Sequence, residues 1–460
     1  MKTLLRGGFV VSGRGCRRAD VLIDGEKIEK VGHIPPELAA QSELVDVTGC
    51  MLFPGFIDAH THFDLDVCNT TTADDFESGS KSAIRGGTTT VIDFACPNKG
   101  ESLAYGLDLW HKKADGKCYC DYGFHMTIDD WNESIESELD AMIEAGITSF
   151  KMYLTYPAMM IGDGAVYRAL KALKARGGIA GVHCENAGVI DARIAELKAS
   201  GLGADVVSHP VSRPDYLEAE AVSRLLRIAQ AADAPVIIVH TTNKASLAEI
   251  AAARRRGQTV YVETCPQYLA LDDGVYYDPD FSSVARYVCA PPIRSQEDSE
   301  ALWKALRRGE VQTISTDHCS FTLEQKDMGR EDFTKIPGGL PGVETRGEVI
   351  YTIAENENKL SLAGVCRALS ENPAKLYGLF PRKGVIAPGS DADIVIYDPG
   401  ASHVLHGAEL LSKAGYTPFE GFRTNGGVSK VYLRGSLQVD GGKVIGGKTG
   451  EYLKRGKCVL

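Results

Sequence analysis

Long apolar runs are missing from this chain of 460 residues. No stretch approaches the roughly 18 consecutive apolar residues that a membrane-spanning helix needs. The opening sequence MKTLLRGGFVVSGRG is interrupted by Arg6 and Gly7, so we do not expect a signal peptide. A basic excess is also missing, because the net charge is −11. These absences argue against a membrane protein and against nucleic acid as a partner.

A cysteine framework and a phosphate-binding loop are missing as well. The 12 cysteines are scattered, and several of them, such as Cys96, Cys184 and Cys265, lie in apolar stretches. This pattern is typical of reduced, buried thiols, so we expect a cytoplasmic protein without a disulfide framework. No Gly-rich loop follows the first apolar strand, which weakens the case for a doubly wound nucleotide-binding sheet.

Eight short apolar segments recur along the middle of the chain and predict eight buried strands. Amphipathic patterns lie between them, as in Val166, Ala169 and Leu173, which predict helices. Apolar strands that alternate with helices indicate parallel strands covered on both faces. We therefore predict an α/β protein built on a (β/α)8 barrel, with a doubly wound open sheet as the alternative. The expected strands span residues 56–62, 88–95, 120–128, 149–155, 179–185, 236–242, 260–267 and 311–318.

The two ends of the chain differ from the middle. Residues 1–53 and 383–440 carry short alternating stretches, separated by turn signals such as DGEK and DGGK. Neither end is long enough to build a core alone, so we expect both to form one small β-sandwich. The barrel, residues 54–382, would be inserted between them. Residues 441–460 are basic in part and are predicted to form a C-terminal arm, a candidate contact between subunits.

Ionisable side chains fall at or near the carboxyl ends of five expected strands. In a (β/α)8 barrel these ends form one rim, where catalytic groups collect. Residues i and i+2 of a strand face the same side, so two histidines separated by one threonine can both point into the barrel mouth. Imidazoles and carboxylates are ligands of zinc and related metals. This rim group comprises His60, His62, Lys151, His183, His240 and Asp317.

Lys151 is the unusual member of the rim group, because it lies between Phe150 and Met152 in an apolar strand. A buried ammonium is costly, and neighbouring metal ions would raise that cost. One interpretation is an ion pair with a carboxylate. The other is that the neutral amine reacts with carbon dioxide to form a carbamate, an anion that can bridge two metal ions. The residues alone leave both interpretations open.

Other polar residues near these strands have structural interpretations. His125 lies within a strand, His209 precedes a proline in an expected loop, and His318 points away from the residue before it if the strand alternates. Asp64 and Asp66 continue the alternation beyond the histidine pair. We expect them to support the loop rather than to bind metal.

Nine motifs follow one another in the order GFIDAHTHFD, GGTTTVIDF, SFKMYLTY, VHCEN, IVHTTN, VETCPQYL, APPIR, STDHCSF and PGGLPGVETR. Together with GVIAPGSDADIVIYDP, they make nearly the whole chain resemble the dihydropyrimidinase and D-hydantoinase family of the amidohydrolase superfamily. The resemblance implies a hydrolase that opens hydantoins or dihydropyrimidines, 5-substituted ones above all, to N-carbamoyl amino acids. It also implies a homotetramer.

The resemblance further implies two divalent metal ions held by the rim group, with zinc expected and manganese as the other candidate. The more buried ion would be bound by His60 and His62. The second ion would be bound by His183 and His240. A carbamate on Lys151 would bridge the two.

Catalytic and substrate-binding roles are also implied by the resemblance. Asp317 would bind the first ion and carry a proton from a metal-bridging hydroxide to the leaving ring nitrogen. Tyr156 would stabilise the oxyanion that forms when the hydroxide attacks the ring carbonyl. The ring amide would be held by the main chain of Ala290 and Gly338, where many relatives carry serine and asparagine.

The loop residues Leu65, Tyr153 and Met160 would line the pocket for the ring substituent by the same resemblance. Their apolar or aromatic character suits an aryl or alkyl group, and it suits plain packing equally well.

Three other groups with this fold are alternatives. Dihydroorotases carry an arginine soon after the histidine pair, where this chain has Phe63, Asp64 and Leu65. Allantoinases share the metal ligands but differ after the histidine pair, and they provide the second candidate activity. Collapsin response mediator proteins are non-catalytic scaffolds that lack the full ligand set, which is intact in this chain.

Overall fold

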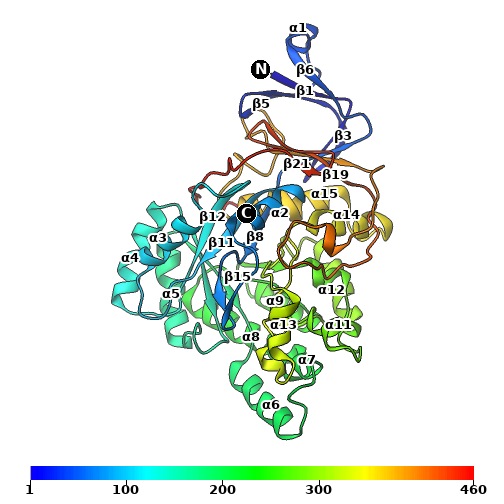
Figure 1. The fold of residues 1–460 in the computed structure, drawn as a ribbon. Coiled ribbons are helices and arrows are strands. Elements are labelled where there is room, and N and C mark those ends of the chain that lie inside the picture. The colour runs from blue at the N-terminus through cyan, green and yellow to red at the C-terminus, as the bar shows by residue number, and fades with distance from the viewer. Residues whose placement is uncertain (1) are drawn as a thin grey trace.

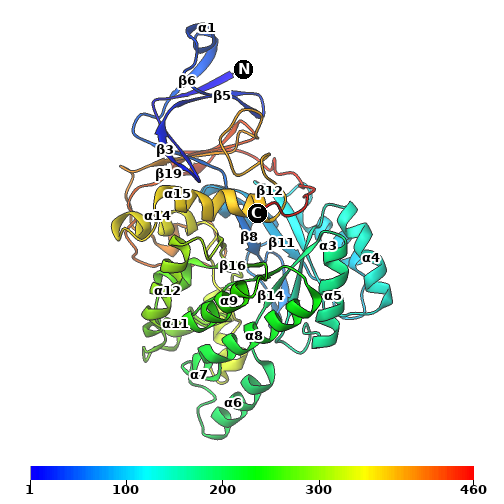
Figure 2. The ribbon, with the colours of Figure 1, turned by 180° about the vertical axis from the view of Figure 1, so that it is seen from behind.

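The structure of the protein is a computed structural model that describes residues 2–460. It consists of a large barrel and a smaller β-sandwich (Figure 1). The sandwich lies at one end of the molecule and helix α6 (Ala187–Ala199) at the opposite end, in both views (Figures 1 and 2).

Eight parallel strands form the wall of the barrel, each paired with its neighbour in chain order. The first and last strands meet through a bridge between Thr61 and His318, where the amide of His62 donates to the carbonyl of His318 at 2.8 Å. The strands are apolar because helices cover them outside and side chains fill the barrel inside. They are β8 (Phe56–Thr61), β11 (Thr88–Ala95), β12 (Asp121–Thr127), β13 (Ser149–Tyr153), β14 (Ile179–His183), β15 (Val236–Ile238), β16 (Val260–Thr264) and β17 (Thr313–Ile314).

Helices surround this wall and begin at polar capping residues. The Asp75 carboxylate accepts from the amide of Ser78 at 2.8 Å, and the Ser78 hydroxyl accepts from the amide of Asp75, which forms a capping box. Asn132 and Asn243 cap two further helices in a similar way. The main helices are α2 (Phe76–Arg85), α3 (Leu103–Ala114), α4 (Glu133–Glu144), α5 (Asp163–Ala175), α8 (Asp215–Ala232), α9 (Lys244–Arg255), α12 (Gln296–Arg307) and α14 (Arg346–Asn356).

Insertions at the carboxyl ends of the strands build a second layer above the barrel mouth. The amide of Phe333 donates to the carbonyl of Gly203 at 2.8 Å, and the Lys198 ammonium donates to Asp332 at 2.9 Å. These bonds join the insertion after β14 to the insertion after β17. The inserted elements include α6, α7 (Ser208–Ser212), α10 (Pro266–Ala270), η1 (Asp273–Tyr276), α11 (Phe281–Ala285), α13 (Leu323–Lys326), η2 (Asp327–Gly329) and η3 (Phe333–Lys335).

The sandwich is built from both ends of the chain. Leu5, Val21 and Leu52 from the N-terminal part share one core with Ile394 and Tyr432 from the C-terminal part. The predicted (β/α)8 barrel with a sandwich from both chain ends is therefore confirmed. The sandwich strands are β1 (Lys2–Arg6), β2 (Phe9–Ser12), β3 (Gly15–Arg18), β4 (Asp20–Asp24), β5 (Lys27–Gly32), β6 (Ser42–Asp46), β7 (Met51–Pro54), β18 (Ile394–Asp398), β19 (Gly427–Leu433), β20 (Ser436–Asp440) and β21 (Lys443–Val444).

These strands form a four-stranded sheet in the order β5-β4-β1-β6 and a seven-stranded sheet in the order β21-β20-β19-β18-β7-β2-β3. Strands β7 and β18, which are more than 300 residues apart in sequence, pair directly in antiparallel fashion. The seven-stranded sheet extends to Val444, beyond residue 440 where the sequence predicts its end. The short helices α15 (Leu362–Cys366) and α16 (Asn372–Leu376), joined by the π-helical turn η4 (Arg367–Glu371), lead from the barrel to the C-terminal strands.

A buried ionic cluster fixes the sandwich on the barrel. The Lys383 ammonium lies 2.8 Å from Asp121 and 2.5 Å from Asp393, and Arg434 also pairs with Asp121. Asp121 begins barrel strand β12, whereas the other three residues belong to the C-terminal part of the chain. Removing one partner of such a buried pair costs about 3–5 kcal/mol, because the remaining charge stays uncompensated.

The last residues of the chain cross the amino-terminal end of the barrel. The amide of Leu453 donates to the carbonyl of Tyr122 at 2.7 Å. The side chain of Arg455 is buried beneath the barrel, with Nη1 2.7 Å from the Ser149 hydroxyl. This part of the predicted arm packs against its own subunit, and the contact between subunits stays a prediction.

Two further observations concern the helices and the cysteines. Within residues 2–460, no helix combines the length and the apolar character that a membrane crossing needs. The 12 cysteines all lie in the described part of the chain and are unpaired there.

Candidate active site

A cavity of about 410 Å³ opens at the carboxyl ends of the barrel strands, and all six members of the rim group line it. These side chains come from β8, β13 and β14 and from the segments that follow β8, β15 and β17. The barrel therefore brings together residues that lie up to 257 positions apart in the sequence, between His60 and Asp317.

Nitrogen and oxygen donors converge at the floor of this cavity. The Asp317 Oδ1 atom lies 3.2 Å from His60 Nε2 and 3.1 Å from His62 Nε2. His60, His240 and Asp317 each offer a ligand atom, and the three atoms lie within 4.8 Å of one another. A group of imidazole and carboxylate donors this close together fits a divalent transition-metal ion.

Two buried carboxylates orient two of the imidazoles. His60 Nδ1 lies 2.6 Å from Glu263 Oε1, and His183 Nε2 lies 2.8 Å from Glu185 Oε2. Each carboxylate accepts a hydrogen bond from the N–H of one ring nitrogen, so the other nitrogen keeps its lone pair. Carboxylates commonly fix metal-binding histidines in this way. The two rings are therefore prepared to donate to metal through Nε2 of His60 and Nδ1 of His183.

Burial and neighbouring groups shift the pKa values of His62 and Asp317 in the rim group. Burial lowers the pKa of His62 to about 4, which keeps its imidazole neutral. Although burial alone would raise it, the pKa of Asp317 is held well below its usual range by His60 and His62. Neutral imidazole and ionised carboxylate are the forms that bind metal ions.

Lys151 is 1% exposed, and this burial disfavours its charged form. In the described part of the chain, its Nζ atom is 3.4 Å from His60 Nε2, and no carboxylate lies in ion-pair range. Burial lowers the pKa of Lys151. A neutral amine is the form that reacts with carbon dioxide, so this environment favours the carbamate interpretation over the ion pair.

Three of the predicted site residues have left-handed backbone conformations. The φ angle is 65° at Tyr156, 36° at His240 and 54° at Asp317. Such conformations cost of order 1–3 kcal/mol each and are held by the surrounding structure. They turn the chain sharply where it leaves the barrel wall, which aims the three side chains into the cavity.

The Tyr156 ring lies beside the second pair of imidazoles, with its centre 5.2 Å from that of His183. The Arg213 guanidinium lies 6.0 Å from the centre of the same tyrosine ring and donates to Glu185 at 2.9 Å. Burial raises the pKa of Tyr156, so the hydroxyl stays protonated and can act as a hydrogen-bond donor.

Most, but not all, of the predicted substrate contacts line the cavity. Met160, which is 38% exposed, does not line the cavity, and its neighbour Met159 does. The amides of both methionines bond to the carbonyl of Tyr156, which forms a helical turn that points adjacent side chains in different directions. The predicted contacts that do line the cavity are Leu65, Tyr153, Tyr156, Ala290 and Gly338.

Sequence reasoning missed both of the orienting carboxylates and one wall of the cavity. Glu263 is a charged residue within an apolar strand, the same signal that marks Lys151. Glu185 lies two residues after His183, a spacing that also pairs His60 with His62. The missed wall comes from the insertions, which carry no comparable local signal. Its members are Ile194, Arg213, Phe333, Thr334 and Ile336.

The three histidines with structural interpretations behave differently from one another. Both nitrogens of His125 are bonded, to the Ser149 hydroxyl at 2.6 Å and to the Ala59 carbonyl at 2.9 Å. His318 is buried and lies 3.0 Å from Asp74. These contacts agree with structural roles. His209 differs, because it lines the cavity even though its Nε2 bonds to a backbone carbonyl.

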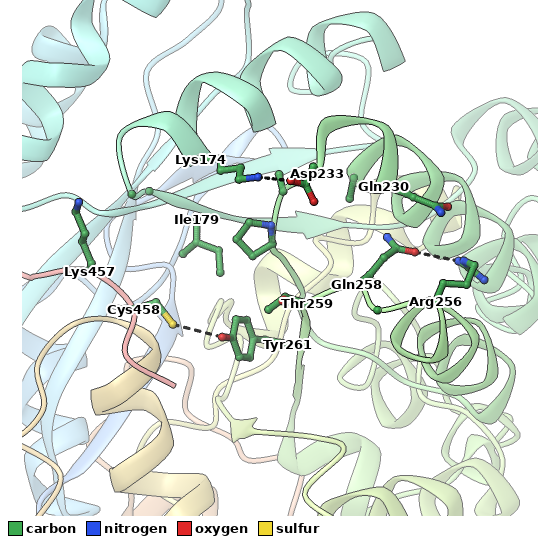
Figure 3. Close-up of a pocket in the computed structure, with 16 residues that line it drawn as sticks. Lys174, Ile179, Gln230, Asp233, Arg256, Gln258, Thr259, Tyr261, Lys457 and Cys458 are labelled. Carbon is green, nitrogen blue, oxygen red and sulfur yellow. Dashed lines mark hydrogen bonds and ion pairs between the residues drawn. The ribbon is translucent and has the colours of Figure 1, made fainter.

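A second cavity, of about 530 Å³, lies at the opposite end of the barrel (Figure 3). It is lined by Ile179, the first residue of β14, and by residues that directly precede β15 and β16. Its Lys174 ammonium pairs with Asp233 at 2.6 Å, and Arg256 donates to Gln258 at 3.1 Å. Lys174 and Arg256 are thus engaged by neighbouring side chains, and no member of the rim group lines this cavity, so it is not the catalytic candidate.

A (β/α)8 barrel whose strands deliver imidazole, lysine and carboxylate groups to one rim is typical of metal-dependent hydrolases. Residues 51–438 match the amidohydrolase family. The chain therefore belongs to the amidohydrolase family, and the predicted enzyme class, a hydrolase, is confirmed.

Full-length relatives narrow this assignment. The chain is 41% identical over 461 residues to a D-hydantoinase from Geobacillus stearothermophilus, covering 99% of this chain and 97% of the relative. It is 40% identical over 463 residues to a D-hydantoinase from Streptomyces coelicolor, covering 99% and 98%. The crystal structure of dihydropyrimidinase from Brevibacillus agri superimposes with a TM-score of 0.97 at 40% identity, covering all of both chains. The resemblance to the hydantoinase and dihydropyrimidinase group is thus confirmed.

Proposed function

We propose that the protein is a metal-dependent cyclic amidohydrolase that opens hydantoin and dihydropyrimidine rings to N-carbamoyl amino acids. The observation that carries this proposal is the convergence of four imidazoles, a buried lysine and a carboxylate on one cavity. The names of the full-length relatives support the class of substrate.

The rim group fits two divalent ions, zinc or else manganese. His60 and His62 would hold the first ion together with Asp317, and His183 and His240 would hold the second. A carbamate on Lys151 would give both ions a shared anionic ligand. When bound, such ions lower the pKa of water and polarise a carbonyl group.

The chain's own residues would bind the ring and move the proton. Asp317, which is kept ionised, can accept a proton from the attacking water and deliver it to the leaving ring nitrogen. The Tyr156 hydroxyl can donate a hydrogen bond to the oxygen on which negative charge develops. Main-chain groups at Ala290 and Gly338 would hold the ring amide, because the side chains there offer no polar atom.

Apolar side chains around the cavity support a substituted ring as substrate. Leu65, Met159, Phe333 and Ile336 line the space beyond the rim group. A substituent at ring position 5, such as a phenyl group, would leave water for this surface and gain binding free energy. The names of the relatives support D stereochemistry at this position.

A substrate panel tests the proposal. Protein loaded with zinc or manganese would be assayed on dihydrouracil, hydantoin, the two enantiomers of 5-phenylhydantoin, allantoin and dihydroorotate. We expect ring opening of dihydrouracil, hydantoin and 5-phenylhydantoin, with preference for the D enantiomer of 5-phenylhydantoin. Turnover of allantoin alone would replace the proposal with an allantoinase.

Metal content separates the enzyme from a non-catalytic scaffold. We expect about two metal ions per chain in protein purified without chelator, by elemental analysis. Far less metal, together with no hydrolysis of any ring in the panel, would instead support the scaffold.

Assembly and location remain part of the proposal. We expect a homotetramer in the cytoplasm. Unpaired cysteines throughout the described chain support a reducing compartment. Light scattering on the purified protein should give a mass near four times the 49.5 kDa of one chain. A monomeric mass would contradict the tetramer without affecting the proposed chemistry.

A further inference from the structure

Lys326 is a buried lysine outside the rim group. It is the last residue of α13, and it is only 1% exposed. Its ammonium donates three hydrogen bonds to main-chain carbonyls, those of Val288 at 2.8 Å, Pro337 at 2.6 Å and Gly339 at 2.8 Å. All three N–H groups of the ammonium are therefore used on backbone oxygens.

These three carbonyls flank the two segments that line the cavity with main chain. Val288 lies two residues before Ala290, and Pro337 and Gly339 lie on either side of Gly338. The amide of Gly339 also donates to the carbonyl of Val288 at 3.0 Å. Lys326 therefore sits where the two segments meet and bonds to both of them.

The second segment has little freedom to move toward the barrel. A Cβ atom added at Gly339 would lie 2.3 Å from the carbonyl oxygen of Cys319, so the two stretches of backbone are in close approach. The amide of Cys319 donates to the carbonyl of Leu340 at 3.1 Å. The segment is thus held between the chain that follows Asp317 and the ammonium of Lys326.

Side chains cannot compensate for a shift of these segments. Ala290 offers only a methyl group, and Gly338 offers none. A Cβ added at Gly338 would meet no atom of residues 2–460 within 4 Å, so this backbone faces open space. Recognition of a ring amide here depends on where the backbone N–H and C=O groups stand, and errors of about 1 Å are costly for such recognition.

We propose that Lys326 is a positioning residue for substrate binding, which holds the segments around Ala290 and Gly338 at the separation that fits a cyclic amide. The inference rests on the proposed function and deepens it. Burial lowers the pKa of Lys326 to about 8, because an ammonium is costly to bury. The three hydrogen bonds to carbonyls offset part of this cost. Since Lys326 touches the two segments and not the rim group, it should affect KM and leave the metal content unchanged.

The test compares Lys326→Met and Lys326→Gln with the wild-type enzyme. The methionine variant removes all three donors at similar volume, and the glutamine variant keeps two. The matched control is Lys304→Met, which makes the same chemical change at an exposed lysine of α12 that does not line the cavity. Values of kcat and KM would be measured for hydantoin and for 5-phenylhydantoin, together with metal content and Tm.

We expect Lys326→Met to raise KM roughly tenfold for both substrates, because they share the ring amide, with two metals per chain retained. Lys326→Gln should give a smaller rise and Lys304→Met none. If Lys326→Met does not fold, the glutamine variant alone must show the rise in KM.

Unchanged KM in the folded variants, with only kcat or Tm lowered, would show that Lys326 is merely structural and would overturn the inference. If the wild-type protein opens neither ring, the proposed function itself fails and the inference falls with it. The wild-type assay thus tests the proposed function, and the ratio of the variant KM to the wild-type KM tests the role of Lys326.

Discussion

The two ends of the barrel contain cavities of similar size and opposite character. The cavity at the carboxyl ends of the strands, about 410 Å³, is lined by the rim group, in which imidazoles and a lysine face one carboxylate. The cavity at the amino ends is larger, about 530 Å³, but two of its cations, Lys174 and Arg256, bond to Asp233 and Gln258 beside them. Cavity volume therefore does not identify the site, whereas the convergence of donor atoms does.

The two ends also differ in how their charged groups are buried. Lys151 is buried without a carboxylate partner in the described chain, while Lys174 is 45% exposed and paired. Burying an ionisable group costs free energy, and a fold retains such a group where function requires it. The following predictions test this contrast.

Replacing the buried lysine should have the largest effect. Loss of a group that only orients a metal ligand costs up to about 100-fold in activity. Lys151→Ala removes a proposed metal ligand itself, so it should lower kcat/KM by more than about 100-fold. Metal content should fall below two per chain. Short carboxylic acids such as propionate should restore part of the activity. If kcat/KM does not fall in Lys151→Ala, and if added carboxylic acids do not raise it, the carbamate proposal is wrong.

Replacing an orienting carboxylate should weaken one metal site. Glu263→Gln should raise the metal dissociation constant of the site that contains His60 by about 10–100-fold, because a neutral amide orients the imidazole less strongly. Competition with a chelator measures this constant. The exposed Glu196→Gln on α6 is the control. Equal affinities in both variants would show that Glu263 has no role in metal binding.

Replacing an apolar residue of the inserted wall should change selectivity. Ile336→Ala should lower kcat/KM for 5-phenylhydantoin about tenfold relative to hydantoin, because it removes apolar contact with the substituent alone. The exposed Val189→Ala on α6 should leave this ratio unchanged. An equal loss on both substrates would assign Ile336 to general stability and not to the substituent pocket.

Replacing the paired lysine at the other end should have the smallest effect. Lys174→Ala should change kcat/KM less than about twofold and Tm by only about 1 °C, because exposed ion pairs contribute little stability. Steady-state kinetics and thermal unfolding measure both values. A loss of activity comparable to that of Lys151→Ala would break the contrast between the two ends.

The barrel strands could be predicted because their signals are local. All eight expected segments contain a strand of the barrel wall, although β15 and β17 are only three and two residues long. Their shortness has a physical cause. Both strands give way early to segments that turn sharply at His240 and Asp317, and no periodic pattern records such a turn.

The site was predicted in part for the same reason. The rim group lies at strand ends, so the barrel geometry alone indicates its convergence. Met160 was placed in the pocket by resemblance, but a helical turn brings Met159 there. Glu263 could have been found from its charge in an apolar strand. Arg213, Phe333 and Ile336 could not, because their position depends on how two insertions pack together.

The sequence by itself determined the barrel, the sandwich and the residues of the rim group, since apolar periodicity and strand ends are properties of neighbouring residues. Only the tertiary structure decided which carboxylate orients which imidazole. It also decided that Lys326 ties two backbone segments of the cavity together. Such contacts join residues that are far apart in the chain. These residues come within hydrogen-bond distance of one another only when the barrel has closed.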